Sequence, residues 1–191
     1  AFIQDPKLPR SIFAIEGSDE LAIETGSFSK IAGFTGIRLG WTVVPKKLCF
    51  NDGSSVQADW KRLLSTSFNA ASIISQKGGL AVLDPEGQKE VQDLVHYYLE
   101  NAKMFRSFFK KKGFSVYGGD HSPYVWVDFS PKTSWEAFAF LLEKGHLLTI
   151  PGSGFGKCGE HYVRLSGFCT KEEAVESVSR MKDFIANYNT I

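Results

Sequence analysis

The spacing of apolar residues along the chain predicts two parts that are built differently. In the first part, short apolar runs at 21–24 and 36–44 predict two strands with a small, polar segment between them. Apolar residues at helical intervals then predict three helices, over 56–65, 72–83 and 87–112. Gly113 directly follows the longest helix, and we expect it to form the C-terminal cap of that helix.

The second part mixes short strands with helices. The apolar pattern predicts strands at 114–117, 124–129, 147–150 and 162–165, and helices at 134–144 and 171–188. A break inside or after the long helix would separate these two patterns, and we expect one domain over residues 1–95 and a small α+β domain over 96–191. Trp126, in the second of these strands, is expected in the core of the small domain.

Composition narrows the possible functions. The 191 residues are 43% hydrophobic, so the chain can bury a core, and the 22 basic and 21 acidic residues leave a net charge of only +1. This balance gives no indication that the chain binds nucleic acid or an anionic membrane surface. No apolar run approaches the ~18 residues that a membrane span needs. The three cysteines have no metal-ligand spacing, so we expect free thiols and no metal site.

Residues 27–40 (SFSKIAGFTGIRLG) combine a lysine, hydroxyl side chains and an arginine in a glycine-punctuated segment. A lysine that forms a Schiff base must be reachable from a pocket, so small neighbours such as those around Lys30 favour that chemistry. Arg38 and Ser27, with Ser29 as a weaker candidate, can supply the donors that hold a phosphate group. The alternative is a surface loop with a solvated lysine and an arginine that pairs with a carboxylate.

Three further features are candidates for binding. Arg164 stands between apolar residues in a predicted strand, and its planar guanidinium suits a carboxylate, although an exposed strand arginine is the simpler alternative. Asn69 lies between two predicted helices and either caps the helix that follows or reaches a ligand. Residues 151–156 (PGSGFG) lead into another strand rather than a helix, which argues against a dinucleotide-binding loop.

Residues 27–40 resemble the pyridoxal-phosphate attachment signature of class I aminotransferases, including Gly33, Phe34, Gly36 and Leu39-Gly40 around the lysine and the arginine. The resemblance implies an α/β fold: the C-terminal part of the large α/β/α pyridoxal-phosphate transferase domain, followed by a small α+β domain. It implies pyridoxal 5'-phosphate as the cofactor. The implied roles are Lys30 as the catalytic lysine that carries the cofactor, Ser27, Ser29 and Arg38 as cofactor contacts, Asn69 as a cofactor or substrate contact, and Arg164 as the substrate-carboxylate arginine.

Longer stretches, at 34–45, 67–72, 116–119, 123–127 and 151–156, resemble the LL-diaminopimelate aminotransferases and the related plant lysine aminotransferases of pipecolate synthesis. The resemblance implies amino transfer between LL-diaminopimelate, or a lysine-like amino acid, and a 2-oxo acid such as 2-oxoglutarate. It also implies a soluble homodimer that binds neither nucleic acid nor membrane and works in a plant plastid or otherwise in the cytoplasm.

Two other functions are compatible with these residues. One is a pyridoxal-phosphate lyase or synthase of the aminocyclopropane-carboxylate type, and the other is an inactive, truncated paralogue. The resemblance implies a considerably longer protein, whose other half would bring a phosphate loop and the aspartate that pairs with the pyridinium nitrogen. Asp5 stands too late in the pattern to be that aspartate. We therefore expect that the 191-residue piece alone does not turn over.

Overall fold

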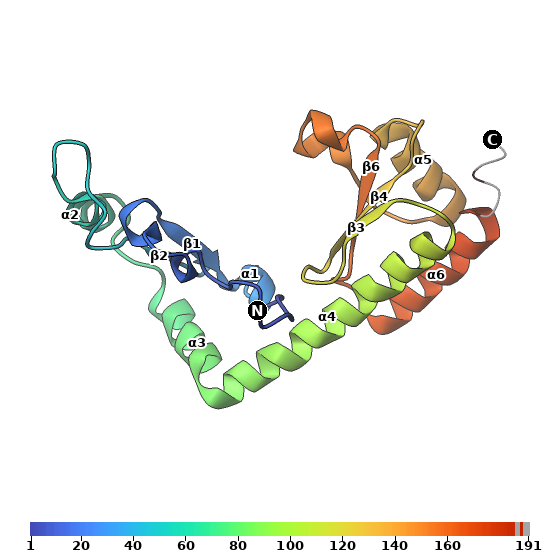
Figure 1. Ribbon diagram of the computed structural model, residues 1–191. Helices are drawn as coiled ribbons and strands as arrows, with labels where there is room; N and C mark the ends of the chain where they lie inside the picture. Colours follow the sequence, from blue (N-terminus) through green and yellow to red (C-terminus); the bar gives the residue numbers. More distant parts are fainter. Residues whose placement is uncertain (186–187, 189–191) are drawn as a thin grey trace. The chain divides into compact units, whose positions relative to one another are not determined.

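The computed structural model describes residues 1–185 and 188, and the chain forms two compact units (Figure 1). The first unit comprises Ala1 and Asp5–Leu94. The second comprises Phe2–Gln4 and the chain from Val95 onward. The division falls inside the long helix α4 (Pro85–Lys111), which begins two residues before the predicted helix and ends one residue before its predicted end. Gly113 has a left-handed backbone (φ 86°), as expected for a helix cap.

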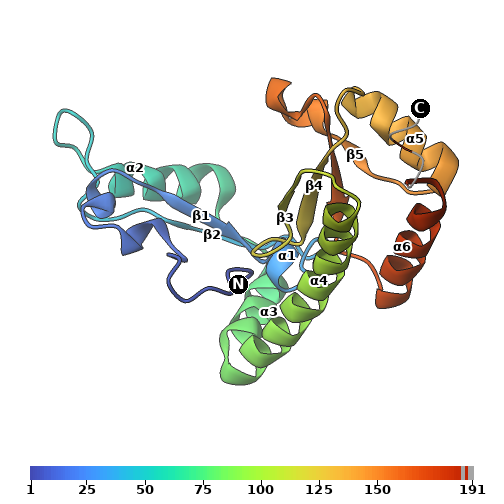
Figure 2. The same ribbon diagram turned by 45° about the vertical axis from the view of Figure 1, so that its right-hand side comes forward.

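The first unit is organised around an antiparallel hairpin. Strand β1 (Glu24–Ser27) pairs with β2 (Gly40–Val43) so that Glu24 faces Val43 and Ser27 faces Gly40. Figure 2 shows the two strands side by side, with helix α1 (Phe28–Ile31) at the end of β1. The strand predicted at 21–24 starts later than expected, because the 3-10 turn η2 (Ser18–Glu20) ends on Leu21.

The remaining elements of the first unit are helical: η1 (Ile12–Ala14), α2 (Val56–Leu63), the π-helix η3 (Leu64–Phe68) and α3 (Ile73–Leu83). Ser55 caps α2, and its hydroxyl accepts a hydrogen bond from the Ala58 N–H at 3.2 Å. Ser72 occupies the N-cap position of α3. The interpretation of Asn69 as the cap of that helix is therefore wrong, since Asn69 ends η3 instead.

The second unit contains a four-stranded antiparallel sheet in the order β3-β4-β6-β5. Its strands are β3 (Val116–Gly118), β4 (Tyr124–Asp128), β5 (Ile150–Pro151) and β6 (Tyr162–Ser166). Besides the rest of α4, its α-helices are α5 (Ser134–Gly145) and α6 (Lys171–Ile185). Two 3-10 turns, η4 (Gly152–Phe155) and η5 (Lys157–Gly159), lie between β5 and β6. Of the strand predicted at 147–150, only Ile150 forms a ladder, because β5 is a short edge strand. Residues 186–187 of the last predicted helix lie outside the described residues.

One face of this sheet carries the core. Val125, Val127, Val163 and Leu165 are buried, and helices α4, α5 and α6 supply the side chains that cover them, among them Phe105, Phe109, Ala137, Leu141, Met181 and Ile185. Trp126 lies between Val125 and Val127, so the two-residue period of a strand turns it to the opposite face. Its predicted place in the core is therefore wrong.

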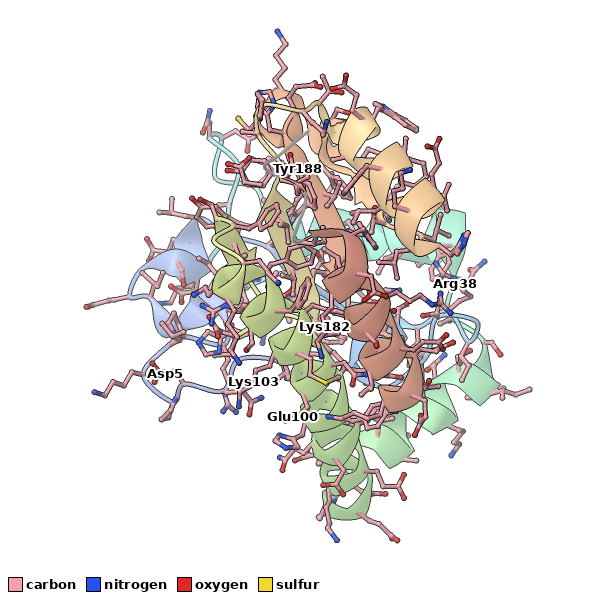
Figure 3. All side chains as sticks on the ribbon, turned by 90° about the vertical axis from the view of Figure 1, so that its right-hand side faces the viewer. Asp5, Arg38, Glu100, Lys103, Lys182 and Tyr188 are labelled. Carbon is pink, nitrogen blue, oxygen red and sulfur yellow. The ribbon has the colours of Figure 1, made fainter. Side chains whose placement is uncertain are left out.

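Tyr188 completes this core after the last described helix (Figure 3). Its hydroxyl donates a hydrogen bond to the Phe129 carbonyl. Burial, followed by the negative charges of Asp128 and Glu136, raises the pKa of Tyr188 to about 12. The phenol therefore stays protonated and keeps its donor at any physiological pH.

The turn after β6 is fixed against helix α4. The fully buried Asn101 donates through its side-chain amide to the carbonyls of Gly167 (3.2 Å) and Cys169 (2.8 Å). A Cβ atom on Gly167 would lie 2.5 Å from the Tyr98 carbonyl oxygen, so only glycine allows this approach to the helix backbone. These contacts hold the end of the strand that carries Arg164.

Candidate functional site

The segment that carries Lys30 is a loop closed at its root by the hairpin. Ser27 pairs with Gly40, and the Phe28 N–H donates to the Leu39 carbonyl at 3.1 Å. A Cβ atom on Gly40 would lie 2.8 Å from the Gly26 carbonyl oxygen, which explains why the second strand begins with glycine. The loop therefore leaves and rejoins the sheet at one point.

Three hydrogen bonds connect residues of this loop. The Ser29 N–H donates to the Ser27 hydroxyl (3.1 Å), the Thr35 hydroxyl donates to the Ser29 carbonyl (3.0 Å), and Nη1 of Arg38 donates to the Thr35 carbonyl (2.8 Å). Lys30 is exposed and follows Ser29 in α1. The structure thus brings Ser27, Ser29, Lys30 and Arg38 into one hydrogen-bonded loop. Sequence reasoning missed Thr35, which is hydrogen-bonded both to Ser29 and to Arg38.

Arg38, which is labelled in Figure 3, has a left-handed backbone with φ 64°. A non-glycine residue in this region costs about 1–2 kcal/mol, and such strain is concentrated at functional sites. The hydrogen bond to Thr35 occupies one of the five N–H donors of the guanidinium. The other donors of this exposed side chain can serve an anion. The strand predicted at 36–44 would include Arg38. In the structure Arg38 lies two residues before β2, so that part of the prediction is wrong.

Helix α3 packs against the loop and forms a hydrogen bond with it. Phe28 and Phe34 are buried with ring centres 5.7 Å apart, and a Cβ atom on Gly78 would lie 3.3 Å from the Phe34 ring. The buried Ser75 donates its hydroxyl hydrogen to the Ile37 carbonyl at 2.7 Å. Sequence reasoning missed this support, and the pair Gly78-Gly79 inside a helix was the signal, because glycine there needs a packing reason.

Asn69 belongs to the same unit as this loop but has no described contact with it. It is exposed, its backbone is left-handed (φ 66°), and its N–H donates to the Leu64 carbonyl at 2.6 Å. Within residues 1–185 and 188, its side-chain amide makes no hydrogen bond. The predicted role of Asn69 toward a cofactor or substrate therefore stays a prediction.

Arg164 lies in β6 of the second unit, where its neighbours across the ladder are Trp126 and Ile150. Its guanidinium carbon lies 4.3 Å from the ring centre of Tyr124 and 4.7 Å from that of Phe155. No carboxylate of the described chain forms an ion pair with it, and its buried Nε reaches no acceptor there. The predicted carboxylate-binding arginine is thus a cation held by aromatic rings rather than by an acid.

A groove of about 450 Å³ borders Arg164 and is otherwise mostly apolar; its walls include Trp135, Phe138, Leu148 and Pro151. Tyr162, two residues before Arg164, has its side chain on the same sheet face. Burial first, and then the charge of Asp128, raises the pKa of Tyr162, so its phenol remains a neutral donor. An arginine in such surroundings suits a ligand that has a carboxylate and an apolar stem.

Comparison with known proteins gives a consistent picture. A family model described as "Aminotransferase class I and II" matches residues 2–181. The LL-diaminopimelate aminotransferase of Protochlamydia amoebophila is 50% identical over 182 residues, which cover 95% of this chain and 44% of that protein. The probable chloroplastic LL-diaminopimelate aminotransferase of Oryza sativa subsp. japonica is 55% identical over 174 residues, or 91% and 38% of the two chains.

The solved structure of L,L-diaminopimelate aminotransferase from Chlamydomonas reinhardtii superposes with a TM-score of 0.92 at 53% identity, covering 95% of this chain and 45% of that one. An aromatic aminotransferase structure from Pyrococcus horikoshii OT3 shares the fold with a TM-score of 0.82. The predicted α/β fold is confirmed. The chain spans less than half the length of these relatives. No helix of the described residues is both long and apolar enough to cross a membrane.

Proposed function

The chain belongs to the family of class I and II aminotransferases, and from this premise we propose that it carries the cofactor lysine and the carboxylate-binding arginine of a pyridoxal-phosphate-dependent transaminase. The observation that carries the proposal is the hydrogen-bonded loop around Lys30. The proposed substrates are LL-diaminopimelate or a lysine-like amino acid and a 2-oxo acid such as 2-oxoglutarate. The names of the most similar relatives support this substrate class.

The residues of the loop fit pyridoxal 5'-phosphate chemically. An aldehyde with a phosphate group requires a reachable amine and several fixed donors for the anion. The loop offers the amine of Lys30, the hydroxyls of Ser27 and Ser29, and the guanidinium of Arg38, which is fixed to Thr35 at one nitrogen. Lys30 would hold the cofactor and the other three would contact its phosphate. The bound cofactor supplies the ring that takes up electrons from the substrate α-carbon.

The chain's own groups then have separate tasks. Once the substrate amine has replaced it on the cofactor, the Nζ atom of Lys30 would move the proton to and from the substrate α-carbon as a general acid–base group. Arg164 binds the α-carboxylate and orients the amino acid. Residues 1–95 form part of the cofactor domain in this proposal, and residues 96–191 form the small domain.

Assembly and compartment complete the proposal. We propose a homodimer in which Asn69, exposed at a helix end, reaches cofactor or substrate across the subunit interface. Apolar side chains on α3 are exposed, among them Ile73, Ile74, Leu80 and Leu83. Their exposure supports the proposal that further protein covers this part of the first unit. We also propose a plastid location, which the printed names of the rice and Arabidopsis thaliana relatives support.

Chemical trapping tests the proposal directly. The chain is incubated with pyridoxal 5'-phosphate, reduced with borohydride, digested and analysed by mass spectrometry. We expect the label at Lys30, because its amine stands among donors for the phosphate. Lys77, an exposed lysine on α3, is the matched control: Lys77→Ala should leave the label unchanged, and Lys30→Ala should remove it. Labels spread over the surface lysines would contradict an organised site in this chain.

The left-handed backbone of Arg38 allows its strain to be separated from its binding role. Glycine relieves the strain at φ 64° and alanine does not, so we expect Arg38→Gly to have a free energy of unfolding about 1 kcal/mol higher than Arg38→Ala. Both variants lack the guanidinium, so both should bind pyridoxal 5'-phosphate more weakly than the unaltered chain. Urea unfolding and a cofactor titration measure the two effects. Equal stability of the two variants would refute the strain, and unchanged cofactor affinity would refute the phosphate contact.

A further inference from the structure

The guanidinium of Arg164 packs against aromatic rings. Its guanidinium carbon lies over the rings of Tyr124 (4.3 Å) and Phe155 (4.7 Å), and its Nε has no acceptor in the described part of the chain. The negative faces of the rings attract the cation and fix its plane, but they occupy none of its in-plane N–H donors. The rings thus hold the guanidinium as a carboxylate partner would, while its donors remain for an incoming anion.

The two rings are anchored in different ways. Tyr124 belongs to the central strand β4, and its ring packs edge-on against Phe168 with centres 5.7 Å apart. Phe155 lies at the end of the 3-10 turn η4, where 55% of it is exposed. The Phe155 ring packs edge-on against Trp126, at 5.1 Å, and Trp126 is the residue opposite Arg164 in the ladder. A half-exposed phenylalanine contributes little to a core, so its ring is available for another role.

The root of the turn fixes the position of Phe155. A Cβ atom on Gly152 would lie 2.3 Å from the Gly159 carbonyl oxygen, and one on Gly159 would lie 2.1 Å from the Gly152 oxygen, so the two backbone segments touch. The fully buried Ser134 donates its hydroxyl hydrogen to the Ser153 hydroxyl at 2.9 Å. These contacts join the turn to the start of α5 and set where the Phe155 ring meets Arg164.

We infer that Phe155, together with Tyr124, is a positioning residue for carboxylate recognition by Arg164. The inference deepens the proposed function and rests on it for the identity of the substrate. With the ring in place, the guanidinium is oriented before the carboxylate arrives, so binding orders fewer side-chain rotations. Without the ring, Arg164 keeps its charge but loses one of the two surfaces that hold its plane. The expected effect is on the binding of carboxylates rather than on the chemical step.

Two substitutions separate the ring from the bulk of the side chain. Phe155→Leu removes the ring, Phe155→Tyr keeps it, and Phe50→Leu is the matched control, since Phe50 is 49% exposed and lies in the first unit. In the chain joined to the N-terminal half of its Chlamydomonas reinhardtii relative, we expect Phe155→Leu to raise KM for both substrates about tenfold with kcat within about twofold. A tenfold rise corresponds to the loss of a partly desolvated cation–π contact. Phe155→Tyr and Phe50→Leu should keep the KM of the unaltered protein.

A second readout needs no turnover. Proton–nitrogen NMR of the arginine Nε–H groups follows Arg164 directly, with its signal assigned by its loss in Arg164→Lys. In Phe155→Leu the signal should lose the shift caused by the ring, and sodium glutarate should bind about tenfold more weakly than to the unaltered chain. Unchanged glutarate affinity and an unchanged Nε–H signal would overturn the inference. So would weaker binding accompanied by a lower unfolding temperature than that of Phe50→Leu, because the ring would then be structural.

The two proposals fail in different ways. If the chain joined to the N-terminal half of its Chlamydomonas reinhardtii relative transfers no amino group and Lys30 is not labelled, the proposed function is wrong. The glutarate titration still decides the inference in that case, because it reports only on Arg164 and its rings. If the unaltered protein is active and Phe155→Leu has the same KM and the same glutarate affinity, the inference alone is wrong.

Discussion

Lys30→Ala is expected to lower the rate of amino transfer by about 10³-fold or more, because the substitution removes the group proposed to move the proton at the substrate α-carbon. Lys30→Arg should be equally inactive, since a guanidinium keeps its proton and cannot act as the base. The measurement is the formation of glutamate from 2-oxoglutarate with LL-diaminopimelate as the donor. Lys77→Ala, which changes an exposed lysine of the same unit, should retain full activity.

These assays use the chain joined to the N-terminal half of its Chlamydomonas reinhardtii relative, which shares 53% identity with it over the matched part. The 191-residue chain is tested beside this hybrid, since we predict that it does not turn over alone. Activity in Lys30→Ala close to that of the unaltered hybrid would remove Lys30 from the mechanism. Consumption of the amino acid without any need for the 2-oxo acid would favour the lyase alternative over the transaminase.

Arg164→Lys is expected to lower kcat/KM by about a hundredfold for both the amino acid and the 2-oxo acid. A lysine keeps the charge but cannot offer two parallel N–H donors to a carboxylate, and a charged hydrogen bond contributes about 1.5–3 kcal/mol. Most of the loss should appear in KM, since the carboxylate is bound before and during the reaction. Steady-state kinetics with both substrates measures the effect.

Arg180→Lys is the matched control for this experiment. Arg180 lies on α6 in the same unit and pairs with Glu176 one helical turn away, so its replacement should leave kcat/KM unchanged. Stability of the two variants is compared by urea unfolding. A loss of activity in Arg164→Lys that follows a loss of stability would indicate a structural arginine, and equal kcat/KM in both variants would contradict carboxylate binding by Arg164.

Much of the fold could be predicted from the chain because the helices are long and periodic. The spacing of apolar residues located α3 and α4 to within two residues at each end, and the resemblance of residues 27–40 predicted the family that the comparisons show. Short strands were less predictable. Strand β1 started three residues late and β5 was nearly absent, because pairing partners rather than local preference determine where a strand begins and ends.

In the candidate site, too, one part could be predicted from the sequence and another part depended on the tertiary structure. The sequence by itself determined which side chains are candidates for the chemistry, because Lys30, Arg38 and Arg164 have functional groups that few other residues offer. Only the tertiary structure decided what holds them. The Thr35 bridge, the Ser75 hydrogen bond beneath the loop, and the two rings over Arg164 all join groups that are not neighbours in the chain. Such contacts depend on the register of the strands and the approach of helices, and no local pattern encodes these distances.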